Sequence, residues 1–284
     1  MQRSEERSSN SDAFLNSHLN IKHVGACVRP NHFKDYSKKI PNFINWFELL
    51  ADNFFHDDKI IENLPFIFER PSVLHCVGLS IGSAEPLNKD YLNKIKKLDE
   101  QVNAIHISDH LCWTRLENQS SFDLLPLPYC QESVELVSDK LKELEDFFSK
   151  PFLLENVSTY LPTPLDTMSE VDFINEILSR TDSFLLLDVN NIYVNSVNHK
   201  FDPHHFIDQI EPKSVKQIHM AGHKKFDTYI LDNHGDFVDA KVWELYKYSI
   251  EKLGHIPTCL EWDQNIPDFE TYLDESRKIH ELYM

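Results

Sequence analysis

Residues 151–191 have the sequence PFLLENVSTYLPTPLDTMSEVDFINEILSRTDSFLLLDVNN. Two short apolar runs, PFLLENVS from Pro151 and SFLLLDVNN from Ser183, flank an amphipathic stretch over Ser169–Ser179. The apolar runs have the length of buried strands, and the apolar spacing between them is typical of a helix. A strand, a helix and a second strand in this order predict two parallel strands joined by a right-handed crossover.

Six further apolar runs of strand length repeat this pattern along the rest of the chain. They are HVGACVR from His23, NWFELLA from Asn45, SVLHCVGL from Ser72, NAIHISDHL from Asn103, VKQIHMAG from Val215 and TCLEWD from Thr258. Amphipathic stretches that predict helices cover Asn88–Val102, Gln131–Phe148, Lys241–Leu253 and Asp268–Leu282. Eight strands alternating with helices predict an α/β fold, the (β/α)8 TIM barrel, whose usual length is about 250 residues.

The alternative for such a pattern is an open, doubly wound sheet. No GxGxxG or Walker loop follows the first strand, and the chain has only 6 glycines from which to build a phosphate-binding loop. The barrel is therefore the preferred prediction, and it is expected to occupy residues 21–284 as one domain. The polar segment over residues 1–20 is expected to be a flexible N-terminal tail.

Charge and cysteine content exclude several classes of protein. The chain has 46 Asp and Glu against 28 Lys and Arg, and a net charge of −18 disfavours nucleic acid and anionic membranes as partners. The five cysteines are scattered without a CxxC pair, so neither a disulfide framework nor a thiolate zinc site is predicted. No apolar run has the ~20 residues of a membrane span, and the N-terminus lacks the core of a signal peptide. We therefore expect a cytoplasmic protein, and its 15 histidines are the unusual feature.

The active site of a barrel lies at the carboxyl ends of its strands, and residues of metal-binding type occupy six of these ends. They are His75, His110, Glu155, Asp188, His219 and Glu261. Period-two alternation places Glu155 and Leu153 inside the barrel, with Phe152 and Leu154 toward the helices. Any one of the six could be a hydrogen-bonded core residue or a helix cap. Because buried ionisable groups are costly unless they are paired, a ring of six favours cations that bind them together.

Two loops add further candidate ligands. DVNN (residues 188–191) places Asn191 one turn beyond Asp188 in the loop after that strand. LDNH (residues 231–234) either offers Asp232 and His234 to one ion or forms a solvated turn. Histidine and carboxylate without thiolate suit iron, manganese or zinc. There are more candidate ligands than one ion can bind, so two or three ions are predicted, with a carboxylate such as Glu155 bridging a pair.

Seven longer strings make this interpretation more specific: LHCVGLSIGS, SDHLCW, DLLPLPY, LLENVSTY, LLLDVNNIYVN, QIHMAGH and LEWD. In this order, from about Val24 to about Leu282, they resemble the multinuclear non-haem iron-dependent oxidative enzymes. That family includes the methanobactin-biosynthesis oxidase. The resemblance implies a xylose-isomerase-like TIM barrel related to the metal-dependent apurinic endonucleases.

The resemblance also implies three metal sites. The residues that correspond to the ligands are His75, His110 and Glu155 for one ion, Glu155, Asp188, His219 and Glu261 for its neighbour, and Asn191, Asp232 and His234 for the third. In the endonucleases a histidine generally stands at the position of Asn191, and an amide implies a weaker third site. Two motifs depart from the family pattern, because Asp52-Asn53-Phe54 and Ser108-Asp109-His110 each carry an aspartate where a glutamate is common.

For function, the resemblance implies an oxidase or oxygenase that uses two or three iron ions (Fe2+/Fe3+) and O2. Its substrate would be a cysteine-containing precursor peptide made by the ribosome, recognised with a small companion protein. His32, Asp52, Asn53 and Asp263 lie near the predicted mouth, where they would orient substrate, carry protons or serve structural roles. The alternatives on the same barrel are a zinc- or manganese-dependent hydrolase of phosphodiesterase type, a sugar isomerase and a non-enzymatic metal-binding module.

The remaining cysteines and histidines are not expected to bind metal. Cys76 should point toward the helices because it follows His75 directly, and Cys259 should lie one layer below Glu261. His106 is expected to be a core histidine below His110. His204 and His205 follow a helix start at Asp202-Pro203 and are expected to face solvent.

Overall fold

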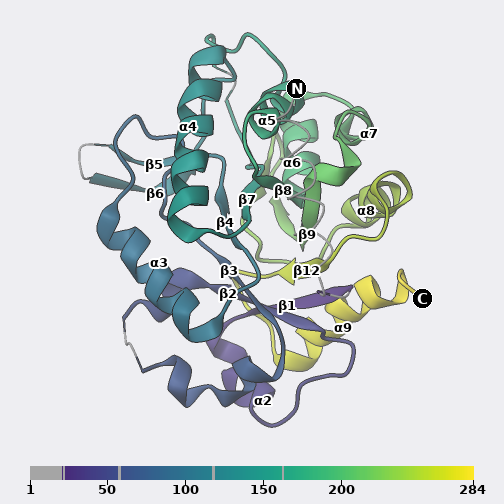
Figure 1. The fold of residues 1–284 in the computed structure, drawn as a ribbon. Coiled ribbons are helices and arrows are strands. Elements are labelled where there is room, and N and C mark those ends of the chain that lie inside the picture. The colour runs from purple at the N-terminus through teal and green to yellow at the C-terminus, as the bar shows by residue number, and fades with distance from the viewer. Residues whose placement is uncertain (1–20, 22, 57–58, 117–118, 162) are drawn as a thin grey trace.

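A computed structural model describes residues 21, 23–56, 59–116, 119–161 and 163–284, and the predicted tail over residues 1–20 lies outside the described residues (Figure 1). Eight strands close into a parallel barrel in the order β1-β12-β9-β8-β7-β4-β3-β2. Their bounds are β1 (Val24–Val28), β2 (Trp46–Leu50), β3 (Ser72–His75), β4 (Ile107–His110), β7 (Phe152–Glu155), β8 (Phe184–Asp188), β9 (Val215–Ala221) and β12 (Thr258–Glu261). Each of the eight predicted runs contains one strand. The TIM barrel is therefore confirmed, and the open sheet is excluded.

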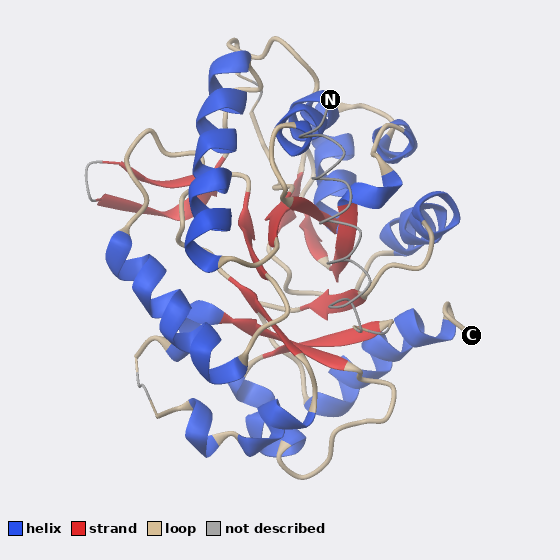
Figure 2. Ribbon diagram, in the orientation of Figure 1, coloured by secondary structure: helices blue, strands red, loops and turns tan. Residues whose placement is uncertain are grey.

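Helices surround the strands, as Figure 2 shows. The α-helices are α2 (Phe33–Tyr36), α3 (Lys89–Val102), α4 (Gln131–Phe148), α5 (Glu170–Ser179), α6 (Val189–His199), α7 (Pro203–Asp208), α8 (Ala240–Leu253) and α9 (Phe269–Glu281). Short 3-10 turns are η1 (Pro30–His32), η2 (Ala51–Phe54), η3 (Ile61–Asn63), η4 (Pro65–Glu69) and η5 (Pro212–Ser214). The five predicted helices agree within one residue at each end, because side chains such as Asn88 and Asp268 cap them. Within the described parts of the chain, no helix has the length and apolar composition needed to cross a bilayer.

The segment after β8 corrects one expectation. Asn191 was expected in a loop, but the helix α6 begins directly at the end of the strand. The reason is that Asp188 is the N-cap of α6, since its Oδ1 accepts a hydrogen bond from the backbone N–H of Asn191 at 2.6 Å. The cap fixes the Asp188 carboxylate and places the Asn191 side chain one turn away.

Two antiparallel hairpins were not predicted. One pairs β5 (Trp113–Leu116) with β6 (Gln119–Leu125) and follows β4. The other pairs β10 (His223–Lys225) with β11 (Ile230–Asp232) and follows β9. Both therefore extend from the carboxyl ends of barrel strands, where the candidate site lies.

Side chains on the strands alternate between the barrel interior and the layer beneath the helices. Phe152, Leu154 and Cys76 belong to the large apolar core between strands and helices, as the alternation predicted. A smaller apolar cluster contains Ile21, Cys27, Trp46, Val73 and Cys259. His204 and His205 are exposed, as expected from their position at the start of α7.

The indole of Trp46 depends on Gly25, its register partner in β1. A Cβ built on Gly25 would lie 2.3 Å from Trp46 Cε2, so any larger residue forces the ring to move. We expect Gly25→Ala to lower the free energy of unfolding by about 1–3 kcal/mol, the usual cost of overpacking a filled core. Urea denaturation measures this loss. In a double variant with Trp46→Val the cost of the added methyl should shrink, and strictly additive losses would contradict the contact.

Candidate metal centre

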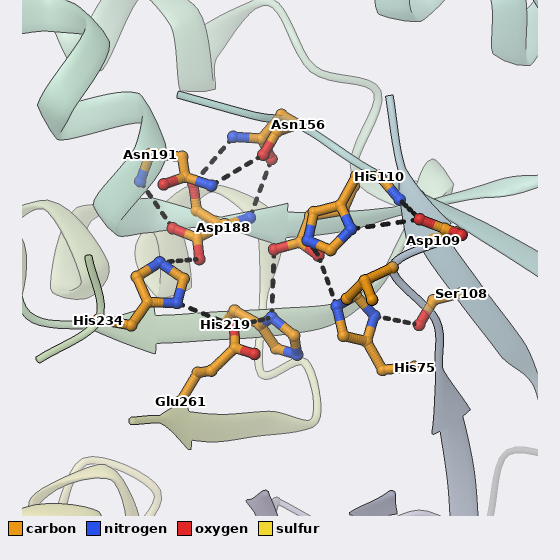
Figure 3. Close-up of polar contacts among 12 residues, drawn as sticks. His75, Ser108, Asp109, His110, Asn156, Asp188, Asn191, His219, His234 and Glu261 are labelled. Atoms are coloured by element: carbon orange, nitrogen blue, oxygen red, sulfur yellow. Dashed lines mark hydrogen bonds and ion pairs between the residues drawn. The ribbon is translucent and has the colours of Figure 1, made fainter. Parts of the chain in front are cut away.

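Six strand-borne side chains converge inside the carboxyl end of the barrel. Figure 3 labels five of them, all except Glu155. His75 ends β3, His110 ends β4, Glu155 ends β7, Asp188 ends β8, Glu261 ends β12 and His219 lies within β9. All six are buried, with at most 7% of their surface exposed. The strand register brings them level, because His110 lies opposite Glu155 and Asp188 lies opposite His219.

Glu155 is shared between two groups of donors. Its Oε2 lies 3.3 Å from Nε2 of His75 and 3.3 Å from Nε2 of His110. Its Oε1 lies 3.2 Å from Nδ1 of His219, which is also 3.1 Å from Oε2 of Glu261. Potential ligand atoms of His75, His110 and Glu155 lie within 4.8 Å of one another, as do those of Glu155, Asp188, His219 and Glu261. The two groups have the same members as the two ligand sets that the family resemblance implied.

The third predicted set lies beside these two groups and has additional neighbours. His234 Nε2 lies 2.7 Å from Asp232 Oδ1, as anticipated, but His234 Nδ1 faces Glu261 Oε2 at 3.2 Å and Asp263 Oδ2 at 3.4 Å. His234, Glu261 and Asp263 are thus a third group within ligand distance of one another. Asn191 lines the same cavity as Asp232 and His234, and its Nδ2 donates to the carbonyl of Asn156 at 3.1 Å.

Among the described residues of this region, six buried polar atoms make no hydrogen bond of good geometry, although five of them lie 2.7–3.8 Å from a histidine nitrogen or a carboxylate oxygen. They are His75 Nε2, Glu155 Oε2, Asp188 Oδ2, Asn191 Oδ1, His234 Nε2 and Glu261 Oε2. Most buried polar atoms in proteins are hydrogen-bonded, so several buried atoms gathered in one place without such a bond require an explanation. Each of these atoms belongs to a predicted ligand. Nitrogen and oxygen atoms coordinate metal cations through their lone pairs. The side chains present therefore fit bound metal ions.

The histidine rings are oriented by hydrogen bonds at their other nitrogen. His75 Nδ1 lies 2.9 Å from Ser108 Oγ, and His110 Nδ1 lies 3.2 Å from Asp109 Oδ1. The other oxygen of Asp109 accepts from the backbone N–H of Leu79 at 2.8 Å. Such partners commonly fix the ring of a metal-binding histidine. In both residues Nε2 is left to face Glu155.

Arg29, which directly follows β1, pairs with two carboxylates at the edge of the centre. Its Nη2 donates to Glu261 Oε1 at 3.0 Å, and its Nε donates to Asp263 Oδ1 at 3.1 Å. The guanidinium fork thus holds one oxygen of each carboxylate. The second oxygen of each faces His234.

Without a cation, the histidines compensate the buried negative charge. Burial disfavours the charged form of His110, but the carboxylates of Glu155 and Asp109 prevail and raise its pKa to about 9. Burial is likewise outweighed at His219, where Glu48, Glu155 and Glu261 raise the pKa well above its usual value. Burial would raise the pKa of Glu155, yet the charges of His110 and His219 lower it. The pKa of Asp188 is raised well above normal, chiefly by burial.

A cavity of about 700 Å³ opens onto the donor groups, with His110, His234 and Glu261 in its wall. Two of the predicted catalytic residues, Asp52 and Asp263, also line it. Asp52 Oδ2 accepts a hydrogen bond from the Tyr91 hydroxyl at 2.7 Å.

The structure places the other two predicted catalytic residues elsewhere. The turn η1 carries His32 over α9, where its ring packs on Phe269 and Tyr272 with centroids 5.5 and 5.3 Å away. Its Nε2 lies 2.9 Å from the carbonyl oxygen of Pro267, so the structure gives His32 a packing role instead of a position in the cavity wall. Asn53 lies on η2 next to Asp52, and it does not belong to the described lining of the cavity.

Comparison with known proteins identifies the family. Residues 23–284 match the family described as RiPP precursor modification enzyme MbnB/TglH/ChrH. The chain belongs to this family. A UPF0276 protein of Acaryochloris marina is 36% identical over 259 residues, which cover 91% of this chain and 94% of that relative.

Solved structures that resemble this member of the MbnB/TglH/ChrH family share its fold. A xylose isomerase domain containing protein from Salmonella typhimurium superposes with a TM-score of 0.60 at 13% identity, covering 94% of this chain and 100% of that one. Endonuclease IV from Thermus thermophilus gives a TM-score of 0.62 at 13% identity, covering 92% and 99%. The fold is thus a xylose-isomerase-like TIM barrel, as the sequence resemblance implied.

Sequence reasoning missed one charged residue beneath the centre of this MbnB/TglH/ChrH family member. Glu48 lies on β2, is 1% exposed, and its Oε2 lies 2.8 Å from Nε2 of His219. A signal was available, because Glu48 is the single charged residue in the apolar run NWFELLA. Alternation would have placed it inside the barrel, on the face of Trp46.

Proposed function

We propose that this chain is an iron-dependent oxidase that uses O2 to modify cysteine residues of a ribosomally made precursor peptide. The proposal rests on one observation. Buried nitrogen and oxygen atoms without a hydrogen bond of good geometry gather on histidines and carboxylates in two groups, and Glu155 belongs to both groups. A donor set of nitrogen and oxygen without thiolate suits iron. Membership of a family of RiPP precursor modification enzymes supports a peptide as the substrate.

The proposed ligands follow the donor groups. They are His75, His110 and Glu155 for one iron, Glu155, Asp188, His219 and Glu261 for a second, and His234 with Asp232, Asn191, Glu261 or Asp263 for a third. When bound, iron supplies the redox chemistry toward O2 and binds the cysteine thiolate of the substrate.

The chain itself contributes an acidic cavity for the peptide and places for protons. Asp263 has 40% of its side chain exposed and stands between Arg29 and His234. Against desolvation, the charges of these two residues lower its pKa, so it stays ionised and can accept hydrogen bonds from the substrate. Asp52 stands in the same cavity wall, and burial raises its pKa. Both carboxylates would orient the peptide backbone through its N–H groups. A companion protein that presents the peptide, and a cytoplasmic location in which its cysteine stays reduced, complete the proposal.

Metal content and oxygen consumption test this function. Protein loaded with Fe(II) under anaerobic conditions is expected to retain at least two iron ions per chain after desalting. On exposure to air, a cysteine-containing peptide should start O2 uptake, whereas the same peptide with serine in place of cysteine should not. Less than one iron per chain would contradict the proposal. A zinc- or manganese-loaded protein that hydrolyses phosphodiesters or isomerises sugars would favour the alternative reactions.

A further inference from the structure

A chain of buried polar side chains lies on the far side of His219 from the candidate metal positions. It consists of Glu48 on β2, Gln217 on β9, Cys27 on β1 and His106, which precedes β4. All four are at most 1% exposed. A buried carboxylate such as Glu48 is costly unless several donors satisfy it, so the partners of Glu48 indicate what holds it there.

The hydrogen bonds along this chain have one consistent direction. His106 Nε2 donates to Gln217 Oε1 at 2.8 Å, which turns the amide nitrogen of Gln217 toward Glu48. That nitrogen donates to Glu48 Oε2, and the thiol of Cys27 donates to Glu48 Oε1 at 3.0 Å. The carboxylate is thereby fixed before His219 is considered.

Glu48 in turn determines which nitrogen of His219 carries a proton. Its Oε2 lies 2.8 Å from His219 Nε2, and an unprotonated Nε2 would direct its lone pair at a carboxylate oxygen. Nε2 must therefore carry hydrogen and donate to Glu48 Oε2. The Gln217 amide nitrogen, 3.0 Å from Nε2, could donate only to an unprotonated ring nitrogen, and it donates to the same Glu48 oxygen instead. With Nε2 facing Glu48, Nδ1 is the ring nitrogen that faces Glu155 and Glu261, 3.2 and 3.1 Å away.

We propose that Glu48, held by Gln217 and Cys27, is a positioning residue that fixes the Nε2–H tautomer of His219 so that Nδ1 binds metal. The inference rests on the proposed metal centre and assigns to Glu48 a role in it. A carboxylate that accepts from the far nitrogen of a metal-binding histidine commonly contributes about 10- to 100-fold in metal affinity. The same range is expected for Glu48.

The group around Glu48 could itself be mistaken for a cation site. Cys27, Glu48, His219 and Cys259 offer atoms within 4.8 Å of one another, and the two sulfurs are 3.3 Å apart. This group differs in its hydrogen bonding from the two donor groups that contain Glu155. Both oxygens of Glu48 accept hydrogen bonds, whereas Glu155 Oε2 and Glu261 Oε2 accept none of good geometry and only face histidine nitrogens at 3.1–3.3 Å. Glu48 is satisfied without a cation, which fits a residue that orients a ligand.

Zinc alone serves as a diamagnetic probe. In zinc-loaded wild-type protein labelled with 15N-histidine, the His219 signals, assigned with His219→Gln, are expected to show a protonated Nε2 and a metal-bound Nδ1. Glu48→Gln keeps the side-chain volume, and it should weaken zinc binding at one site about 10- to 100-fold in competition with a chelator. Glu275→Gln is the matched control: Glu275 is a buried glutamate on α9 that accepts from Trp243 Nε1, and its variant should bind zinc like the wild type.

The outcomes separate this inference from the proposed function. Wild-type protein that binds neither zinc nor iron would overturn the metal centre itself. If wild-type protein binds zinc but His219 carries its proton on Nδ1, or if Glu48→Gln binds zinc with unchanged affinity, the role of Glu48 is wrong. Cadmium-thiolate absorption that disappears in Cys27→Ser and Cys259→Ser variants would also overturn it, by showing that the lower group binds a cation directly.

Discussion

Glu155→Gln protein, loaded with Fe(II) without oxygen, is expected to retain less than one iron per chain and to show no peptide-dependent O2 uptake. The variant keeps the volume of Glu155 but removes the negative charge and one of two oxygen donors. Those oxygens face His75 and His110 on one side and His219 on the other, so both donor groups lose a ligand at once. Substitution of a residue that only orients a metal ligand commonly lowers metal affinity about 10- to 100-fold. Substitution of a ligand shared by two sites should lower it further.

The control for this experiment is Glu170→Gln. Glu170 begins α5 and accepts a hydrogen bond from Asn195 Nδ2 at 3.1 Å. Burial raises the pKa of Glu170 to about 8, so it is largely protonated at neutral pH and glutamine resembles it closely. This variant should keep the iron content and thermal stability of the wild type. If Glu155→Gln retained as much iron as Glu170→Gln, Glu155 would not be a shared ligand.

The fold and much of the candidate centre follow from periodicity in the sequence. Each barrel strand is a short apolar run, and period two decides which side of the strand a residue occupies. In FLLE of β7, for example, Phe152 and Leu154 pack beneath the helices while Glu155 enters the barrel. Because carboxyl ends of parallel strands meet at one end of a barrel, residues from distant segments could be grouped before any distance was known.

The parts that were not predicted depend on contacts between loops. Whether Asp263 faces solvent or His234 is decided by Arg29, which directly follows β1 and holds Asp263 although the two lie more than two hundred residues apart in sequence. His32 is withdrawn from the mouth because its ring finds aromatic partners on α9. Glu48 was missed for another reason, since strand ends were searched and Glu48 lies one layer below them, on the inner face of β2.

Because the residues of the centre ionise, the stability of the metal-free protein and that of the metal-loaded protein are expected to change with pH in opposite directions. In the metal-free protein, burial opposes the charging of His110, but Glu155 and Asp109 raise its pKa from 6.5 to about 9. A raised pKa in the folded state means that protonation stabilises the fold. This contribution is complete below pH 6.5 and is lost as pH rises through about 9. For His110 it amounts to about 3 kcal/mol, and the raised pKa values of His219 and His234 act in the same direction.

Metal binding reverses this trend because a histidine must lose a proton before it can bind a cation. Affinity for zinc is expected to rise about tenfold per pH unit for each proton displaced, so zinc-loaded protein should gain stability over the range in which metal-free protein loses it. Calorimetric unfolding between pH 6.5 and 9, with chelator or with excess zinc, measures both trends. His110→Asn should flatten the decline of the metal-free protein, because it removes one of the groups that titrate. Parallel pH profiles with and without zinc would mean that the histidines keep their protons when zinc is bound, and the ligand assignment would then be wrong.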